Sequence, residues 1–308
     1  MVWGTLVAIY LFMAGIAAGT YLLGTIIETF WSNRGLEMIR KYSLILSFPL
    51  VAISSIFLVV DAEAGLHNPL RLIYILANFP NSMMSVGTLI IASFQIITLY
   101  AAWRALYSKN QSAVMRIIGS VMAVGLTVYT GLLLQVSQAI PFWHNDILPI
   151  LFTVSGISTG FAAAIIIGVY ADRRQLANLM PIKKVHILCL LAEGLLLIAL
   201  LSNAGKIDGG AQSVAKLLTG SLSPLFWGGL VTVGLVLPII IEAYELFKNH
   251  NVIAINNGLH PADETAATID SELNSGFSLL LVSEGAVLLG GFILRYLVLA
   301  AATFISLI

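Results

Sequence analysis

Two tyrosines lie inside apolar stretches that are long enough to cross a bilayer. Tyr10 belongs to the first stretch, and Tyr129 belongs to the motif VYTGLLLQ in the fourth, which ends at Gln135. If both stretches are helices of opposite direction, a rise of about 1.5 Å per residue places the two hydroxyls at a similar depth. Phenol and amide groups donate hydrogen bonds to carbonyl oxygens. A ligand with two carbonyls on an apolar ring, such as a quinone, would suit this chemistry.

Two further polar residues are predicted near the same level. Asp61 ends the second apolar stretch, and Ser85 lies at the start of the third. We expect Tyr129 and Asp61 to act on a bound quinone, and Tyr10, Tyr129, Gln135 and Ser85 to bind its head group. An isolated tyrosine is more often a membrane-surface residue or a core residue bonded to backbone, and this alternative stays open.

Three ionisable residues fall deeper in apolar stretches: Glu193, Glu284 and Arg295. A charged side chain near the centre of a bilayer costs about 2.5–3.5 kcal/mol on insertion scales, so each one is a functional candidate. The carboxylates could carry protons across the membrane. Equally, Glu193 or Glu284 could form a static pair with Arg295 or remain as a protonated core acid.

Resident metal centres are not expected in this chain. The single cysteine, Cys189, excludes a cysteine-ligated iron–sulfur cluster. A bis-histidine haem needs pairs of histidines within helices, and of the five histidines only His186 touches an apolar stretch. We therefore predict no haem, no iron–sulfur cluster and no metal ligands here.

Composition identifies the elements that carry these residues. Of 308 residues, 59% are hydrophobic and 10% are charged, whereas soluble domains carry roughly a quarter charged residues. Runs of about 20 apolar residues span a bilayer as helices. Eight are predicted, at roughly 3–27, 42–61, 84–103, 114–136, 148–171, 186–203, 224–247 and 277–305.

These eight spans predict an all-α integral membrane protein of two packed four-helix bundles. The first bundle would cover 1–136 and hold the quinone pocket, and the second would cover 137–308. A polar segment at about 248–275 is expected to be an inner loop. Small residues in GIAAG (15–19) and GISTG (156–160) are typical of closely packed membrane helices.

The basic residues predict the orientation. Most of the fifteen lysines and arginines fall in alternate connections between the spans, and such connections face the cytoplasm. Both termini then lie on the extracytoplasmic side of a bacterial or archaeal cytoplasmic membrane. Tyr10 and Tyr129 accordingly belong to the outer leaflet.

Two outer connections could dock a partner protein. The first, 61–82, has apolar residues at helical spacing, which indicates a short helix at the interface. The second, 137–149, contains Trp143, expected as an anchor at headgroup level, with His144 and Asp146 directed to water.

The chain resembles the NrfD/polysulfide-reductase membrane-anchor family. The motifs that carry the resemblance are AIYLFMAGIAAG (8–19), VVDAEAGLHNPLR (59–71), SMMSVG (82–87), VYTGLLLQ (128–135), PILFTVSGISTG (149–160) and LRY (294–296). The resemblance implies a quinone pocket in the first bundle, with Tyr129 bonded to the head group and Asp61 nearby. It also implies two partners: an extracytoplasmic iron–sulfur subunit with four clusters, and a molybdopterin or multihaem catalytic subunit.

Together these observations predict a multi-pass anchor subunit that exchanges electrons between menaquinone or ubiquinone and the iron–sulfur subunit. Such a chain binds no nucleic acid and is not catalytic alone. A redox-driven proton pump using Glu193 and Glu284 is one alternative. A small-solute transporter is the other, and it would show an inverted repeat with broken helices at the midplane.

Overall fold

The computed structural model describes residues 4–61, 82–137, 139–207, 209–256 and 266–303, and side chains at 61, 248–256 and 266–274 are not described. The elements are α1 (Thr5–Phe30), α2 (Glu37–Asp61), α5 (Met83–Leu106), α6 (Ala113–Gln135), α7 (Ile147–Ala171), η1 (Arg173–Asn178), α8 (Met180–Ala204), α9 (Gly210–Leu218), η2 (Leu225–Val236), α10 (Leu237–Asn256) and α11 (Ala266–Ala300). Eight helical spans in the described ranges are long and apolar enough to cross a membrane, with η2 and α10 forming one of them. The predicted all-α membrane protein is confirmed.

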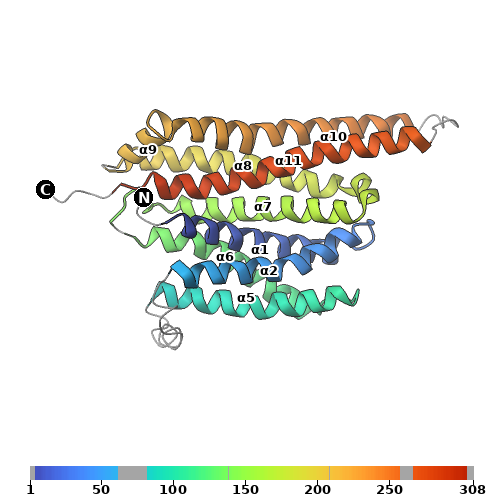
Figure 1. Ribbon diagram of the computed structural model, residues 1–308, viewed down its shortest axis with the longest axis horizontal. Coiled ribbons are helices and arrows are strands. Elements are labelled where there is room, and N and C mark those ends of the chain that lie inside the picture. The colour runs from blue at the N-terminus through green and yellow to red at the C-terminus, as the bar shows by residue number, and fades with distance from the viewer. Residues whose placement is uncertain (1–3, 62–81, 138, 208, 257–265, 304–308) are drawn as a thin grey trace.

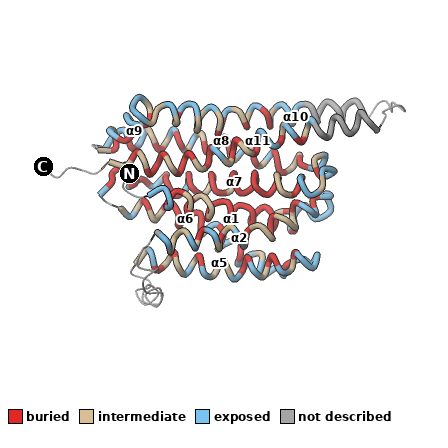
Figure 2. Tube along the Cα trace, viewed as in Figure 1, coloured by how far each residue is buried: buried red, intermediate tan, exposed pale blue. Residues whose placement is uncertain are grey.

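The long helices run side by side along the longest axis of the molecule (Figure 1). The start of α1 and the end of α11 lie at the same end (Figure 1), as an even number of spans requires. Figure 2 shows buried positions gathered on α1 and α7, and exposed positions on the outer helices. In the membrane-spanning part of α1, 78% of the residues are buried, against 28% in α2 and in α8. The central helices therefore contact protein on most sides, and the outer ones present apolar side chains to lipid.

A contact between α1 and α7 joins the two halves of the chain. Gly15 and Gly19 of α1 lie against Gly156 and Gly160 of α7, and a Cβ atom added at Gly19 would lie 2.8 Å from the Cα of Gly160. Small residues four apart share one helix face, so they let two backbones approach closely. The two glycine motifs of the sequence are thus partners of one another. The division into two four-helix bundles at residue 136 stays a prediction.

A buried carboxylate holds together the first four helices at the end opposite the N-terminus. Glu28 of α1 accepts a hydrogen bond from the backbone N–H of Gln111, which precedes α6. The guanidinium groups of Arg40 on α2 and Arg116 on α6 lie 3.9 and 3.8 Å from its oxygens. Tyr21 donates to the Gln111 side chain at 3.0 Å. The side-chain amide of Gln111 also donates to Glu28, at 3.4 Å, so two cations and two amide groups compensate the charge of one buried acid.

Two sequence expectations need correction. The inner loop expected at 248–275 is largely helical, because α10 continues to Asn256 and α11 already begins at Ala266. A helix can extend beyond the bilayer with polar residues. The predicted end of the seventh span therefore marked the end of the apolar residues and not the end of the helix.

The expectation that Trp143 is an anchor at the membrane surface is wrong. Trp143 is fully buried, and its indole N–H donates to the Val298 carbonyl at 2.8 Å. Residues 62–81, where an interfacial helix was expected, lie outside the described residues.

Candidate functional site

Tyr129 lies in the core that the first four helices share. Its side chain is 3% exposed, in a cluster with Ala18 of α1, Val51 of α2 and Phe94 of α5. The phenol ring covers Gly87 of α5 and occupies the space that a Cβ atom at that position would need. A glycine at 87 is therefore what admits the ring between α5 and α6. The predicted role of Tyr129 at a quinone pocket stays a prediction.

Tyr10 lies in an adjoining apolar cluster. It is 1% exposed, and its backbone carbonyl accepts a hydrogen bond from the Ser54 hydroxyl on α2 at 3.0 Å. Its cluster includes Trp143, whereas Tyr129 belongs to the neighbouring one, and Leu133 packs against both. The two tyrosines thus occupy neighbouring regions of one core. Neither is a membrane-surface residue.

The other predicted head-group residues lie in different surroundings. Ser85 is fully buried near the start of α5, two positions before Gly87. Gln135 donates to Asp146 at 2.5 Å, and His144 Nδ1 lies 3.1 Å from the Gln135 carbonyl, so Gln135 fixes the connection between α6 and α7. Six positions separate it from Tyr129, which is a turn of about 600°, so the two side chains leave α6 in directions about 120° apart. Asp61 ends α2, and its side chain lies outside the described set.

Arg295 and Glu193 form the first of two buried charged groups in the second half. The Arg295 guanidinium is fully buried, and its Nη1 donates to the Ser155 hydroxyl at 3.2 Å. Ser155 also hydrogen-bonds the Glu193 carboxylate, and the opposite charges of Glu193 and Arg295 attract one another. The guanidinium lies 5.7 and 5.5 Å from the ring centres of Phe12 and Phe152. Of the two candidate partners for Arg295, Glu193 is the acid whose charge acts on it, and Ser155 bridges the two groups.

Glu284 belongs to the second charged group, with His186 of α8 and Glu242 of α10. The Nδ1 atom of His186 lies 2.7 Å from Glu242 Oε1 and 3.4 Å from Glu284 Oε2. The other ring nitrogen, Nε2, lies 3.1 Å from the Ser158 carbonyl and 3.2 Å from its hydroxyl. All four residues are buried to at least 99%. Glu193, Glu284 and Arg295, the three candidates for proton transfer, are thus divided between two groups, with Glu284 beside His186 and the other two beside Ser155.

Sequence reasoning missed Glu242, the acid nearest to His186. The signal was present, because Glu242 is an ionisable residue inside the predicted span 224–247 and it carries the same insertion cost as Glu193. Glu245, one turn further along α10, forms an ion pair with Lys183 of α8. The Lys183–Glu245 ion pair and the contact between His186 and Glu242 both join α8 to α10.

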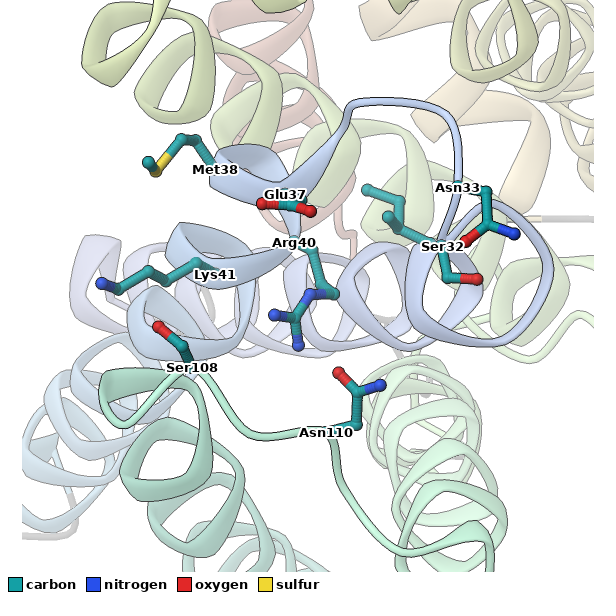
Figure 3. A pocket seen from close by; sticks show the side chains of 9 residues that line it. Ser32, Asn33, Glu37, Met38, Arg40, Lys41, Ser108 and Asn110 are labelled. Carbon is teal, nitrogen blue, oxygen red and sulfur yellow. The ribbon is translucent and has the colours of Figure 1, made fainter.

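A polar cavity of about 420 Å³ opens between the α1–α2 turn and the connection from α5 to α6. Figure 3 shows Arg40 directed between Glu37 and Asn110 and Lys41 directed away from them. Ser32, Asn33 and Ser108 complete most of the polar lining. A quinone ring needs an apolar slot, so this cavity does not suit one.

Comparison with known proteins assigns the family. Residues 1–261 match the family described as "Polysulphide reductase, NrfD". The chain belongs to the NrfD polysulphide reductase family. It is 28% identical to one of the chains of the polysulfide reductase of Wolinella succinogenes, over 79% of this chain and 83% of the relative. It is 25% identical to the protein NrfD of Escherichia coli, over 98% and 95% of the two chains. A subunit of the selenate reductase of Mesobacillus selenatarsenatis is 23% identical, over 78% of this chain and 66% of that relative.

The match to the NrfD family includes only some of the candidate site residues. Tyr129, Glu193 and His186 fall within residues 1–261, whereas Glu284 and Arg295 lie on α11 beyond it. Two relatives are named as parts of reductases, so membership agrees with a membrane subunit of a larger assembly. The resemblance predicted from the sequence motifs is confirmed at the level of the family.

Proposed function

We propose that this NrfD-family chain is the membrane anchor of a respiratory oxidoreductase and exchanges electrons between the quinone pool and an extracytoplasmic iron–sulfur subunit. The observation that carries the proposal is the buried phenol of Tyr129 between α5 and α6, in an apolar core of four helices. Family membership and the reductase names of two relatives support it. Menaquinone and ubiquinone both have the required two carbonyls.

The Tyr129 hydroxyl would donate a hydrogen bond to one quinone carbonyl and orient the ring. Oxidation of the bound quinol breaks two O–H bonds. Two electrons go to the partner's nearest cluster, and two protons leave toward the outer side. Asp61, at the outer end of α2, would accept a proton through water. Tyr10, in the adjoining apolar cluster, and the buried Ser85 of α5 would complete the polar contacts of the head group.

The partner would dock at the outer end of the bundle. His144 and Asp146 are exposed in the connection between α6 and α7, as the sequence predicts for a docking surface. The buried Trp143 between them and the core holds this connection to α11 through its bond to Val298. Electrons would then cross a short distance between the quinone in the outer leaflet and a cluster at this surface. The second predicted docking segment, 62–81, lies outside the described residues.

Substitution of Tyr129 by Phe tests the proposal. The change removes one hydroxyl and keeps the ring over Gly87, so the fold should persist. Loss of one hydrogen bond worth about 1.4 kcal/mol corresponds to roughly a tenfold lower rate. Quinol oxidation by the intact purified complex, followed spectroscopically, should fall at least to that extent. Tyr170→Phe is the matched control, because Tyr170 is exposed at the inner end of α7.

The result distinguishes a contact between the Tyr129 hydroxyl and the quinone from a general effect on assembly of the complex. An unchanged rate in Tyr129→Phe, with the complex assembled, would show that the hydroxyl does not contact the quinone. A lower rate in both Tyr129→Phe and Tyr170→Phe would indicate a general loss of assembly. Bound quinone, extracted and quantified from each preparation, distinguishes a weaker binding step from a slower electron step.

Proton transfer through the second half is a further part of the proposal. Glu193, Ser155 and Arg295 form a buried polar chain in the membrane. Net charge movement in liposomes containing the complete complex tests it. Glu193→Gln should abolish any charge movement beyond quinol exchange and leave quinol oxidation itself intact. Equal charge movement in wild type and Glu193→Gln would exclude this residue from the route.

A further inference from the structure

Three helices of the second half each contribute one ligand-type side chain to a single point. His186 comes from α8, Glu242 from α10 and Glu284 from α11. One nitrogen or oxygen atom of each lies within 4.8 Å of the others, and all three side chains are buried to at least 99%. We propose that these residues bind a divalent transition-metal cation that holds α8, α10 and α11 together.

The imidazole of His186 has the orientation of a metal ligand. The Ser158 carbonyl lies 3.1 Å from Nε2 and can only accept a hydrogen bond, so in the neutral ring Nε2 carries the proton. Nδ1 is then free of a proton, and it lies 2.7 Å from Glu242 Oε1 and 3.4 Å from Glu284 Oε2. Backbone carbonyls commonly hold the second nitrogen of a metal-bound histidine in this way, which fixes both the tautomer and the ring.

The polar atoms of this cluster are poorly satisfied by hydrogen bonds. Among the described residues, His186 Nδ1, both oxygens of Glu242 and Oε2 of Glu284 make no hydrogen bond of good geometry, although Nδ1 lies only 2.7 Å from Glu242 Oε1. The hydroxyl of Ser283, next to Glu284 in the chain, is also buried without a partner in that set. Buried acceptors without donors are costly, and carboxylates more so. A cation among them would satisfy these atoms together.

A divalent cation satisfies the cluster better than a single proton does. A proton on His186 Nδ1 could bond one carboxylate oxygen at a time, which would leave the other acid without a partner. If both acids are ionised, one imidazolium also leaves a net negative charge in the bilayer interior. A divalent cation balances two carboxylates and a neutral imidazole, so the site becomes electrically neutral.

The spacing agrees with the coordination sphere of a small metal ion. Ligands at about 2.0–2.2 Å in a tetrahedral arrangement lie about 3.3–3.6 Å from one another. The separation of 3.4 Å between His186 Nδ1 and Glu284 Oε2 has this value, and the 2.7 Å separation from Glu242 needs a small rotation of that carboxylate. One imidazole and two carboxylates favour Zn²⁺, Fe²⁺ or Mn²⁺ over Ca²⁺, which prefers six or more oxygens.

Metal content measured on the intact complex tests the proposal. The complex is purified through an affinity tag that does not bind metals and then analysed by mass spectrometry of the elements. We expect about one equivalent of a divalent transition metal per chain. Glu242→Gln should lower this content at least tenfold. Glu193→Gln is the matched control, because it neutralises a buried acid outside the cluster and should retain the metal.

A second measurement does not depend on any variant folding. Wild-type complex is treated with a chelator, and its thermal unfolding is followed before and after ZnCl₂ or MnCl₂ is added back. Ligands that bind the folded state raise the unfolding temperature, so chelation should lower it by about 5 °C and one of the two salts should restore it. The partner's clusters also contain metal, so unfolding is followed through proteolytic release of this chain alone.

Two results would overturn the metal site. One is wild-type complex with no divalent metal beyond that of the partner's cofactors and no thermal response to either salt. The other is equal metal content in wild type, Glu242→Gln and Glu193→Gln, which would locate the ion elsewhere. Neither result affects the proposed role of Tyr129. The rate of quinol oxidation in Tyr129→Phe tests the quinone site in the first half, which does not include the metal cluster.

Discussion

The two halves of the chain have similar apolar helices but differ in where they place charge. In α1, α2, α5 and α6, the buried acid Glu28 lies at the end opposite the N-terminus, where Arg40 and Arg116 compensate its charge. In α7, α8, α10 and α11, ionisable groups lie within the spans, where His186 contacts Glu242 and the opposite charges of Glu193 and Arg295 attract one another. The first half therefore has an apolar core that contains isolated hydroxyl groups. The second half holds fixed charges, which the bilayer tolerates only when they are paired.

Replacing Arg295 by Leu should have the largest effect on this arrangement. The change leaves Glu193 without its cation inside the membrane, which costs about 3–5 kcal/mol of unfolding free energy. Unfolding in detergent micelles measures the loss. Arg34→Leu is the control, because Arg34 is exposed in the α1–α2 turn and should change stability by no more than about 0.5 kcal/mol.

The double variant Arg295→Leu with Glu193→Leu sharpens the result. Removal of both charges should restore much of the stability, because no uncompensated ion then remains. If the double variant is as unstable as the sum of the two single variants, the pair is not coupled. The difference between the halves would then reside in packing and not in charge.

The glycine contact between α1 and α7 is the next test. Gly160→Leu introduces a side chain where the backbone of Gly19 lies, and overpacking of this kind costs about 1–3 kcal/mol or more. The fraction of monodisperse protein after solubilisation should fall. In Gly125→Leu the added Cβ meets no atom within 4 Å, so the control should remain monodisperse. Equal behaviour of the two variants would mean that the halves do not depend on this contact.

Trp143→Phe should have the smallest effect. It removes the hydrogen bond to the Val298 carbonyl in a buried position, which is worth about 1 kcal/mol. Thermal unfolding should detect a modest decrease, and the exposed Trp103→Phe should show none. If Trp143→Phe leaves stability unchanged while partner binding weakens, the tryptophan serves the docking surface more than the core.

Much of the fold could be predicted, because the bilayer imposes length and apolarity on each span. The eight spans follow from those constraints. Pairings across the chain could not be predicted from local sequence. The partnership of Glu193 with Arg295, the meeting of His186 with Glu242 and Glu284, and the burial of Trp143 all depend on how helices pack. The end of α10 was not predicted, because a helix can continue beyond its apolar residues.

The crossing of α1 and α7 also bears on motion. Two backbone contacts one turn apart, at Gly15–Gly156 and Gly19–Gly160, leave these helices little freedom to slide or separate. Alternating access needs one half to rock against the other, and this rigid crossing opposes such rocking. Electron tunnelling makes the opposite demand, because its rate depends steeply on a donor-to-acceptor distance that must not fluctuate. A frame that cannot rock would keep that distance constant from one turnover to the next.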